Sequence, residues 1–216
     1  MGVKNSFEKD FQEAIQFFPK LKYRKSEKGK MWIVSGELDI CDQVGDYWET
    51  FIIAIYLPTS YPYCTPRVKE ISQLILRDDD WHINDEGLCC LNIEHRMLLI
   101  AKRGMNLTSF IREKVYPYFA NQLFKKNEGQ YAAGEYLHNF DGVAQFYREE
   151  LNIASPVLAV EVLKGIISNK LPERNDPCFC GNGKYKQCHM ASVEFLRSLP
   201  FSRLDEDLEE FSKLIC

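Results

Sequence analysis

The sequence lacks any long run of apolar residues. Its longest uninterrupted run, Phe51 to Leu57, is far shorter than the ~20 residues that an α-helix needs to cross a bilayer. The N-terminus also has no apolar core of the kind that marks a secretory signal peptide. We therefore expect a cytoplasmic protein that does not engage a membrane.

An excess of positive charge is absent as well. The 216 residues include 27 lysines and arginines against 31 aspartates and glutamates, so that the formal net charge is -4. A chain of this charge has no overall positive field to attract the phosphates of a nucleic acid. We therefore expect no nucleic-acid partner.

The first half of the chain combines one predicted amphipathic helix with three predicted strands. Apolar residues recur at helical spacing from Phe7 to Phe18, and Pro19 ends that pattern. Alternating apolar residues predict strands at 32–40 and 51–57, and the segment 68–76 supplies a third. Because short turns cannot join parallel strands, we expect an antiparallel meander.

Two further segments complete this α+β domain. The basic stretch 20–30 is interpreted as a solvated turn. The apolar pattern from Leu107 to Leu123 predicts a helix that covers the sheet, with Asn106 or Thr108 as its N-cap.

The second half is predicted to be helical around a small module. A polar loop is expected at 125–141, followed by helices at 143–151 and 156–170, the second capped by Ser155. The acidic run near the C-terminus is interpreted as the solvated face of a helix. We therefore predict four parts in chain order: a sheet domain at 1–125, a helical extension at 126–171, a metal-binding module at 172–190 and a helical tail at 191–216.

Three cysteines and a histidine gather in one short glycine-containing segment: Cys178, Cys180, Cys188 and His189. Zinc prefers four tetrahedral nitrogen or sulfur ligands, and the intervening glycines allow the chain to turn back sharply. We predict one Zn²⁺ that folds the segment, because four protein ligands leave no position for a substrate. Free or disulfide-bonded thiols are the alternative. The segment resembles the SEC-C motif, the zinc-binding tail of the translocation ATPase SecA and of many bacterial proteins, which serves as a docking or accessory element.

A second cysteine locus, Cys89 and Cys90, follows the polar turn 85–87. Adjacent side chains of an extended segment point to opposite faces, so we expect one of these cysteines to be buried and the other exposed. An exposed thiol can attack a carbonyl carbon or a thioester in its thiolate form. The alternative is that Cys90 is a small buried apolar residue.

The order of motifs within residues 5–125 resembles that of a ubiquitin-conjugating enzyme. The segment Tyr61 to Val68 resembles the proline loop of that family, and the segment Gly87 to Leu91 resembles its Gly-x-Ile-Cys-Leu. The segment His82 to Asn84 stands where the family has His-Pro-Asn, but it lies two residues closer to the cysteine than in the family.

This resemblance implies a cysteine-dependent acyltransferase in which Cys90 is the nucleophile. Cys90 would accept the C-terminal carboxyl group of a protein as a thioester and pass it to a lysine amine or to water. Asn84 would donate a hydrogen bond to the oxyanion, and His82 would brace the loop. Bacterial relatives act in antiphage defence beside cGAS-like nucleotidyltransferases, so the resemblance also implies such a partner.

Several points stay open at the level of sequence. No Gly-rich nucleotide fingerprint follows a predicted strand, so a separate activating enzyme or an activated donor is expected. A lysine acceptor has an ordinary pKa of ~10.4 and needs a proton acceptor, for which the candidates are Asp85, Glu86, Glu94 and His95. The competing interpretation is a non-catalytic binding adaptor of the same fold with a zinc docking module. A zinc-ribbon nucleic-acid binder is disfavoured by the acidic composition.

Overall fold

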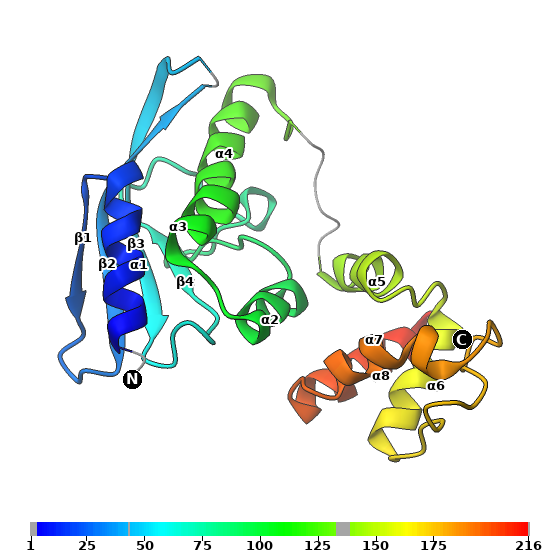
Figure 1. Ribbon diagram of the computed structural model, residues 1–216. Coiled ribbons are helices and arrows are strands. Elements are labelled where there is room, and N and C mark those ends of the chain that lie inside the picture. Colours follow the sequence, from blue (N-terminus) through cyan, green and yellow to red (C-terminus); the bar gives the residue numbers. More distant parts are fainter. Residues whose placement is uncertain (1–3, 43, 133–138, 216) are drawn as a thin grey trace. The chain divides into compact units, whose positions relative to one another are not determined.

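The computed structural model describes residues 4–42, 44–132 and 139–215. The chain divides into two compact units, Met1–Glu135 and Tyr136–Cys216. The first unit contains a four-stranded antiparallel sheet in the order β1-β2-β3-β4 (Figure 1). Its strands are β1 (Leu21–Lys25), β2 (Met31–Cys41), β3 (Tyr47–Pro58) and β4 (Arg67–Glu70). The predicted α+β class and the predicted meander are therefore confirmed.

Two strands differ from their predicted form. The basic stretch 20–30, interpreted as a turn, contains β1, in which Leu21 is buried and the other residues are exposed. Lysine and arginine are common on an edge strand because their charge discourages pairing with another chain. The strand predicted at 68–76 ends at Glu70, where the buried carboxylate accepts hydrogen bonds from the Ser72 hydroxyl and the Leu74 N–H and so turns the chain.

Helices cover one face of the sheet. The helical elements of this unit are α1 (Lys4–Phe17), η1 (Asp79–Trp81), α2 (Glu94–Arg103), α3 (Leu107–Phe110), the π-helical η2 (Ile111–Val115) and α4 (Tyr116–Glu128). Asn106 is the N-cap of α3, since its side chain accepts a hydrogen bond from the Ser109 N–H at 3.0 Å, whereas Thr108 is buried inside the helix. The helix α2 was not predicted.

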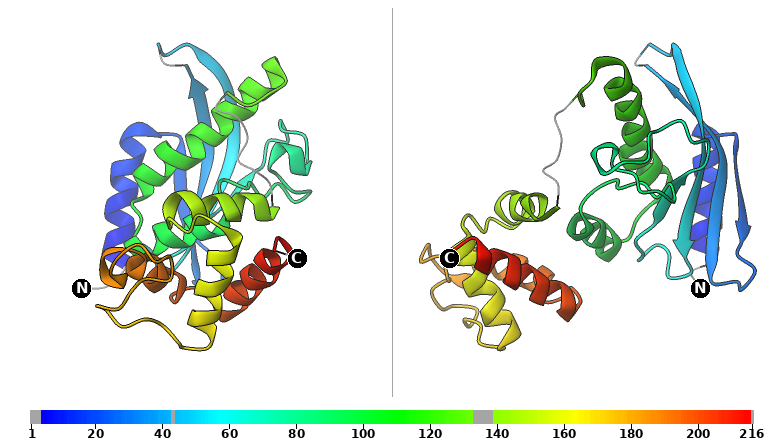
Figure 2. Two further views of the ribbon diagram at one scale, coloured as in Figure 1. Left: turned by 90° about the vertical axis from the view of Figure 1, so that its right-hand side faces the viewer. Right: turned by 180° about the vertical axis from the view of Figure 1, so that it is seen from behind.

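The core of the first unit lies between these helices and the sheet. Val34, Ile55 and Val68 lie opposite one another on β2, β3 and β4 and are buried. On the same face, Phe7 of α1 stacks on Trp32, with ring centroids 4.4 Å apart. Both α1 and α4 lie alongside the sheet in the two further views (Figure 2). This packing holds the loops between β4 and α2 at one edge of the sheet.

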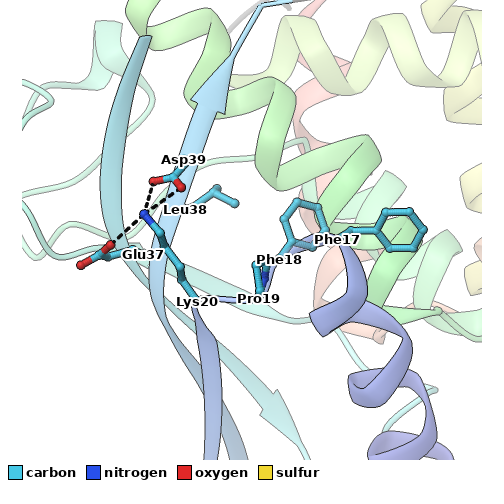
Figure 3. A pocket seen from close by; sticks show the side chains of 7 residues that line it. All are labelled: Phe17, Phe18, Pro19, Lys20, Glu37, Leu38 and Asp39. Atoms are coloured by element: carbon cyan, nitrogen blue, oxygen red, sulfur yellow. Dashed lines mark hydrogen bonds and ion pairs between the residues drawn. The ribbon is translucent and has the colours of Figure 1, made fainter. Parts of the chain in front are cut away.

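An ion-pair cluster joins the end of α1 to the sheet. Lys20 pairs with Glu37 at 3.2 Å and with Asp39 at 2.8 Å, both on β2. These side chains line a small pocket together with Phe17, Phe18, Pro19 and Leu38 (Figure 3). The groups are partly exposed, so the pairs fix the position of the chain more than they stabilise the fold.

The second unit is helical. Its elements are α5 (Asn139–Glu150), α6 (Pro156–Ile167), η3 (Tyr185–Gln187), α7 (Met190–Leu196) and α8 (Phe201–Lys213). Ser155 caps α6 as predicted, since its hydroxyl accepts a hydrogen bond from the Leu158 N–H. Residues 133–138 of the predicted loop lie outside the described residues. Among the described helices, none combines the length and the apolar character needed to span a membrane.

The acidic run of α8 is not solely a solvated face. Asp207 is only 2% exposed, and its carboxylate accepts a hydrogen bond of 2.7 Å from the buried Tyr147 hydroxyl of α5. Burial and this neighbouring carboxylate raise the pKa of Tyr147 well above its ordinary value, so the tyrosine stays protonated and donates. The interpretation of the run as wholly solvated was therefore wrong at Asp207.

Candidate functional site

The cysteine segment extends the sheet at its β4 edge. The Glu70 N–H donates to the Gly87 carbonyl at 2.9 Å, and the Cys89 N–H donates to the Val68 carbonyl at 2.8 Å. Lys69 and Leu88 are thus paired in antiparallel orientation. Because the segment is extended, its successive side chains point to opposite faces.

The two cysteines lie in different environments, as the alternation predicts. Cys89 is buried and belongs to the core, while Cys90 is exposed. Burial raises the pKa of Cys89 to about 12, so this thiol is inert at neutral pH. The Cys90 residue is exposed, yet desolvation around its sulfur also raises its pKa, an effect opposed in part by the backbone of Asn92. Cys90 is therefore accessible but mostly in the thiol form near pH 7.

The backbone brings His82 next to Cys90. The Cys90 N–H donates to the His82 carbonyl at 2.8 Å, and Ile83 pairs with Cys89 in an isolated bridge. His82 ends η1 in a left-handed conformation, with φ of 51°. Its ring lies 5.5 Å from the ring of Tyr131, measured between centroids. These contacts place the His82 backbone beside the cysteine segment and its ring beside Tyr131, and the role of the imidazole stays a prediction.

Asn84 holds the turn that precedes the cysteines. Its side-chain oxygen accepts a hydrogen bond from the Leu88 N–H at 2.9 Å, and its own N–H donates to the Leu88 carbonyl at 3.1 Å. The side chain is exposed. Its NH₂ group, which is the donor that an oxyanion requires, takes no part in these two bonds. Asn84 therefore has a bracing role whether or not it acts in catalysis.

The predicted proton acceptors differ in accessibility. Asp85, Glu86 and Glu94 are exposed, and Glu86 forms an ion pair of 3.4 Å with Lys69. His95 is only 1% exposed, so its ring is not open to an incoming amine. The three carboxylates remain candidates, since an exposed carboxylate can accept a proton directly or through water.

Sequence reasoning missed the contribution of α4 to this site. Three of its side chains donate hydrogen bonds to carbonyl oxygens of the loop 80–82, and they come from Tyr118, Gln122 and Lys125. Tyr118 and Gln122 are buried. The signal in the sequence was the presence of a tyrosine and a glutamine, four residues apart, on the apolar face of the predicted helix.

The four predicted metal ligands converge in the second unit. Their ligand atoms all lie within 4.8 Å of one another. The His189 Nδ1 lies 3.2 Å from the Sγ atoms of Cys178 and Cys188, and the Sγ atoms of Cys180 and Cys188 are 3.4 Å apart. Tetrahedral zinc with these ligands has edges of about 3.5 to 3.8 Å. The group therefore has the composition and the spacing to bind a metal ion.

The turn between the ligand pairs depends on two glycines. Gly181 and Gly183 have φ of 74° and 93°, values that residues with a Cβ rarely adopt. The Cys178 N–H donates to the Gly183 carbonyl at 2.9 Å and closes the turn. The predicted role of the glycines in bringing the ligands together is thus observed.

A contact outside the ligand set orients His189. Its Nε2 lies 2.8 Å from the Asn152 carbonyl, which can only accept, so Nε2 carries the proton and Nδ1 presents its lone pair to the thiols. Burial disfavours the thiolate of Cys178, but hydrogen bonds from the backbone of Cys180 and of His189 oppose this effect, and the pKa of Cys178 is lowered to about 7. Both features suit a ligand set that must bind as imidazole and thiolate.

No protein-family model matches the chain, and a search of curated proteins finds no significant match. The fold is a mixed α+β arrangement with a four-stranded antiparallel sheet and a separate Cys/His group that can bind a metal ion. The resemblances to ubiquitin-conjugating enzymes and to the SEC-C motif therefore rest on the residues and their spacing.

Proposed function

We propose that this protein is an acyl carrier of the ubiquitin-conjugating type, with Cys90 as the carrier thiol. The observation that carries the proposal is the placement of Cys90, an exposed cysteine at the edge of the sheet whose backbone is bonded to the His82 loop. The neighbouring Cys89 is buried and so does not compete for the acyl group.

The reaction has two steps. The Cys90 thiolate attacks the activated carbonyl carbon of a protein C-terminus, a C–S bond forms and the activating group leaves. A lysine amine then attacks the thioester carbon, a C–N bond forms, the C–S bond breaks, and the amine proton passes to a carboxylate or to water. The NH₂ group of Asn84 would stabilise the oxyanion of this second step.

The raised pKa of Cys90 is compatible with this role. Only a minor fraction of the thiol is ionised at pH 7, which slows attack. A thiolate of higher pKa is, however, intrinsically more nucleophilic, and it forms a less reactive thioester because it is a poorer leaving group. A less reactive thioester suits a carrier, because the acyl group must stay bound until the acceptor amine arrives.

The donor that the resemblance favours is a cGAS-like nucleotidyltransferase in bacterial antiphage defence, joined through its C-terminus. A separate enzyme would activate that carboxyl group. In the second unit, we propose that the metal is Zn²⁺, because three thiolates and one imidazole are the ligands that zinc prefers in closed structural sites. Its role would be to fold the segment.

Intact mass spectrometry tests the carrier role. The full-length protein is co-expressed with its genomic neighbours and measured with and without thiol reductant. We expect a mass increase that reductant removes, that Cys90→Ala abolishes and that Cys89→Ala retains. Cys90→Ser should retain the increase in a form that resists reductant, because an ester replaces the thioester. An adduct that persists in Cys90→Ala would disprove the assignment of the sulfur.

The second candidate is a non-catalytic adaptor of the same fold. The raised pKa of Cys90 favours it, because a thiol selected for attack is commonly found with a lowered pKa. This candidate predicts no adduct on any of the variants, so the same experiment separates the two.

A further inference from the structure

One face of α4 is matched to the loop that leads into the cysteine segment. Tyr118, Gln122 and Lys125 are four and then three residues apart, a spacing that places them on the same side of a helix. They bind three successive carbonyl oxygens in reverse order: Tyr118 binds that of His82 at 3.0 Å, Gln122 that of Trp81 at 3.0 Å and Lys125 that of Asp80 at 2.5 Å. The Tyr118 hydroxyl also lies 3.3 Å from the Trp81 carbonyl. Tyr131 adds a hydrogen bond of 3.2 Å to Asp80.

These three carbonyls need partners from outside the loop. They lie at the C-terminal end of the short helix η1, where no N–H group of the helix itself bonds them; the His82 carbonyl accepts a hydrogen bond from the Cys90 N–H. His82 also has a positive φ, a conformation that a residue with a Cβ adopts only where its surroundings hold it. The side chains of α4 therefore help to hold this loop in place.

The His82 carbonyl oxygen accepts hydrogen bonds from both α4 and the cysteine segment. It accepts the Tyr118 hydroxyl on one side and the Cys90 N–H on the other, at 3.0 and 2.8 Å. A carbonyl oxygen has two lone pairs, so both hydrogen bonds can form at once. The Tyr118 side chain and the Cys90 backbone are thus connected through one atom, the His82 carbonyl oxygen.

The Tyr118 hydroxyl is suited to a fixed donor role. It is buried, and desolvation together with the nearby Cys89 and Cys90 thiols raises its pKa far above the ordinary value. The hydroxyl therefore keeps its proton at neutral and moderately alkaline pH. It can hold the His82 carbonyl but cannot act as a base.

We infer that Tyr118 is a positioning residue for Cys90, acting through the His82 carbonyl, with Gln122 as its neighbour on the same helix face. The catalytic consequence rests on the proposed function, whereas the positioning of the thiol does not. Loss of the hydroxyl would loosen the loop, let water reach the Cys90 sulfur and make the thiol easier to ionise.

The test compares two tyrosine variants in the full-length protein loaded with zinc. Tyr118→Phe removes the hydroxyl from the His82 loop. Tyr116→Phe is the matched control, because its hydroxyl also makes two backbone hydrogen bonds, both with Cys41, at 2.7 and 2.9 Å. The measured quantity is the rate of Cys90 alkylation by iodoacetamide between pH 6.5 and 10, assigned by tandem mass spectrometry.

We expect Tyr118→Phe to lower the pH at which the rate of Cys90 alkylation is half its maximum. Tyr116→Phe should leave that pH unchanged. A fall of half a pKa unit would make alkylation near pH 7 about threefold faster. Gln122→Met, of similar size but without the donor to Trp81, should shift the profile in the same direction and serves if Tyr118→Phe does not fold. Identical profiles for Tyr118→Phe and Tyr116→Phe, or an unshifted Gln122→Met profile where Tyr118→Phe does not fold, would overturn the inference.

Alkylation requires no acyl donor, so this result is independent of the carrier role. A shifted profile in a protein that forms no adduct would refute the proposed function and retain the inference. An adduct on Cys90 together with an unshifted profile would support the proposed function and refute the inference about Tyr118.

Discussion

The backbone of Gly87 lies against the carbonyl oxygen of Glu70, so closely that a Cβ on residue 87 would stand 2.6 Å from that oxygen. The approach follows from the hydrogen bond between the Glu70 N–H and the Gly87 carbonyl, which aligns the cysteine segment with β4. Glycine at this position is therefore a condition for the placement of Cys90.

Gly87→Ala should destabilise the first unit strongly. The left-handed conformation costs about 1 to 2 kcal/mol for a residue with a Cβ, and the clash with the backbone adds about 1 to 3 kcal/mol. Gly29→Ala is the control, since Gly29 also has a positive φ but no atom within 4 Å of the added Cβ. Urea denaturation should show the larger loss for Gly87→Ala; equal losses would contradict the close contact.

Asn84→Asp should separate the two roles of this side chain. Aspartate keeps the oxygen that accepts from the Leu88 N–H, so the turn should remain folded. It lacks the NH₂ donor and adds a negative charge beside the oxyanion. We expect thioester formation on Cys90 to persist and transfer to an amine to slow by a factor of about 10² to 10³.

The measurement for Asn84→Asp is single-turnover discharge of a preformed thioester to free lysine. Asn84→Ala provides the comparison, because it removes both the oxygen and the donor and should also destabilise the turn. If Asn84→Asp discharges at the wild-type rate, Asn84 has only the bracing role.

Cys89 should make the stability of the protein fall in alkaline solution. Its pKa is raised from the ordinary 9.0 to about 12 in the folded state. Below pH 9 both states hold the proton; above it the unfolded chain ionises first, so the free energy of unfolding falls as pH rises from 9 towards 12. The slope from this thiol is at most about 1.4 kcal/mol per pH unit.

Urea denaturation at pH 8, 9 and 10 tests this expectation. Other groups also titrate in this range, so the informative quantity is the difference between the wild type and Cys89→Ala. Cys89→Ala should be less stable at pH 8, because it leaves a gap in the core, and should lose less stability between pH 9 and 10. Parallel curves for the two proteins would show that Cys89 is not buried as a thiol.

The Cys/His group should bind one metal ion per chain. Elemental analysis should find zinc in the wild type and in Cys41→Ser, whose cysteine lies in the sheet unit, and little zinc in Cys188→Ser. Chelation should increase hydrogen exchange in the second unit and leave the sheet unit unchanged. Stoichiometric zinc in Cys188→Ser would show that the ion is bound elsewhere.

Local patterns predicted the parts of the structure that depend on neighbours in sequence. The alternation of apolar residues located β2 and β3, and the same rule separated the buried Cys89 from the exposed Cys90. The spacing of cysteine, glycine and histidine sufficed to find the group that can bind a metal ion, because its four residues lie within the short segment 178–189.

Features set by distant partners were missed. Asp207 looked like one more solvated acidic residue, but its partner Tyr147 is 60 residues away. The partners of Tyr118 and Gln122 on α4 could not be predicted either, since these side chains reach the loop 80–82 only after the helix packs. The strand β1 was missed because four of its five residues are exposed and three of them are basic, so that the segment lacks the alternation of apolar residues that predicts a strand.

The hydrogen bond from His189 to the Asn152 carbonyl extends the influence of the metal site beyond its four ligands. Asn152 lies between α5 and α6, so an ion bound at the cluster would also secure the junction of those two helices. Loss of the ion would then expose the second unit to faster degradation, and the abundance of the protein would follow the supply of the metal.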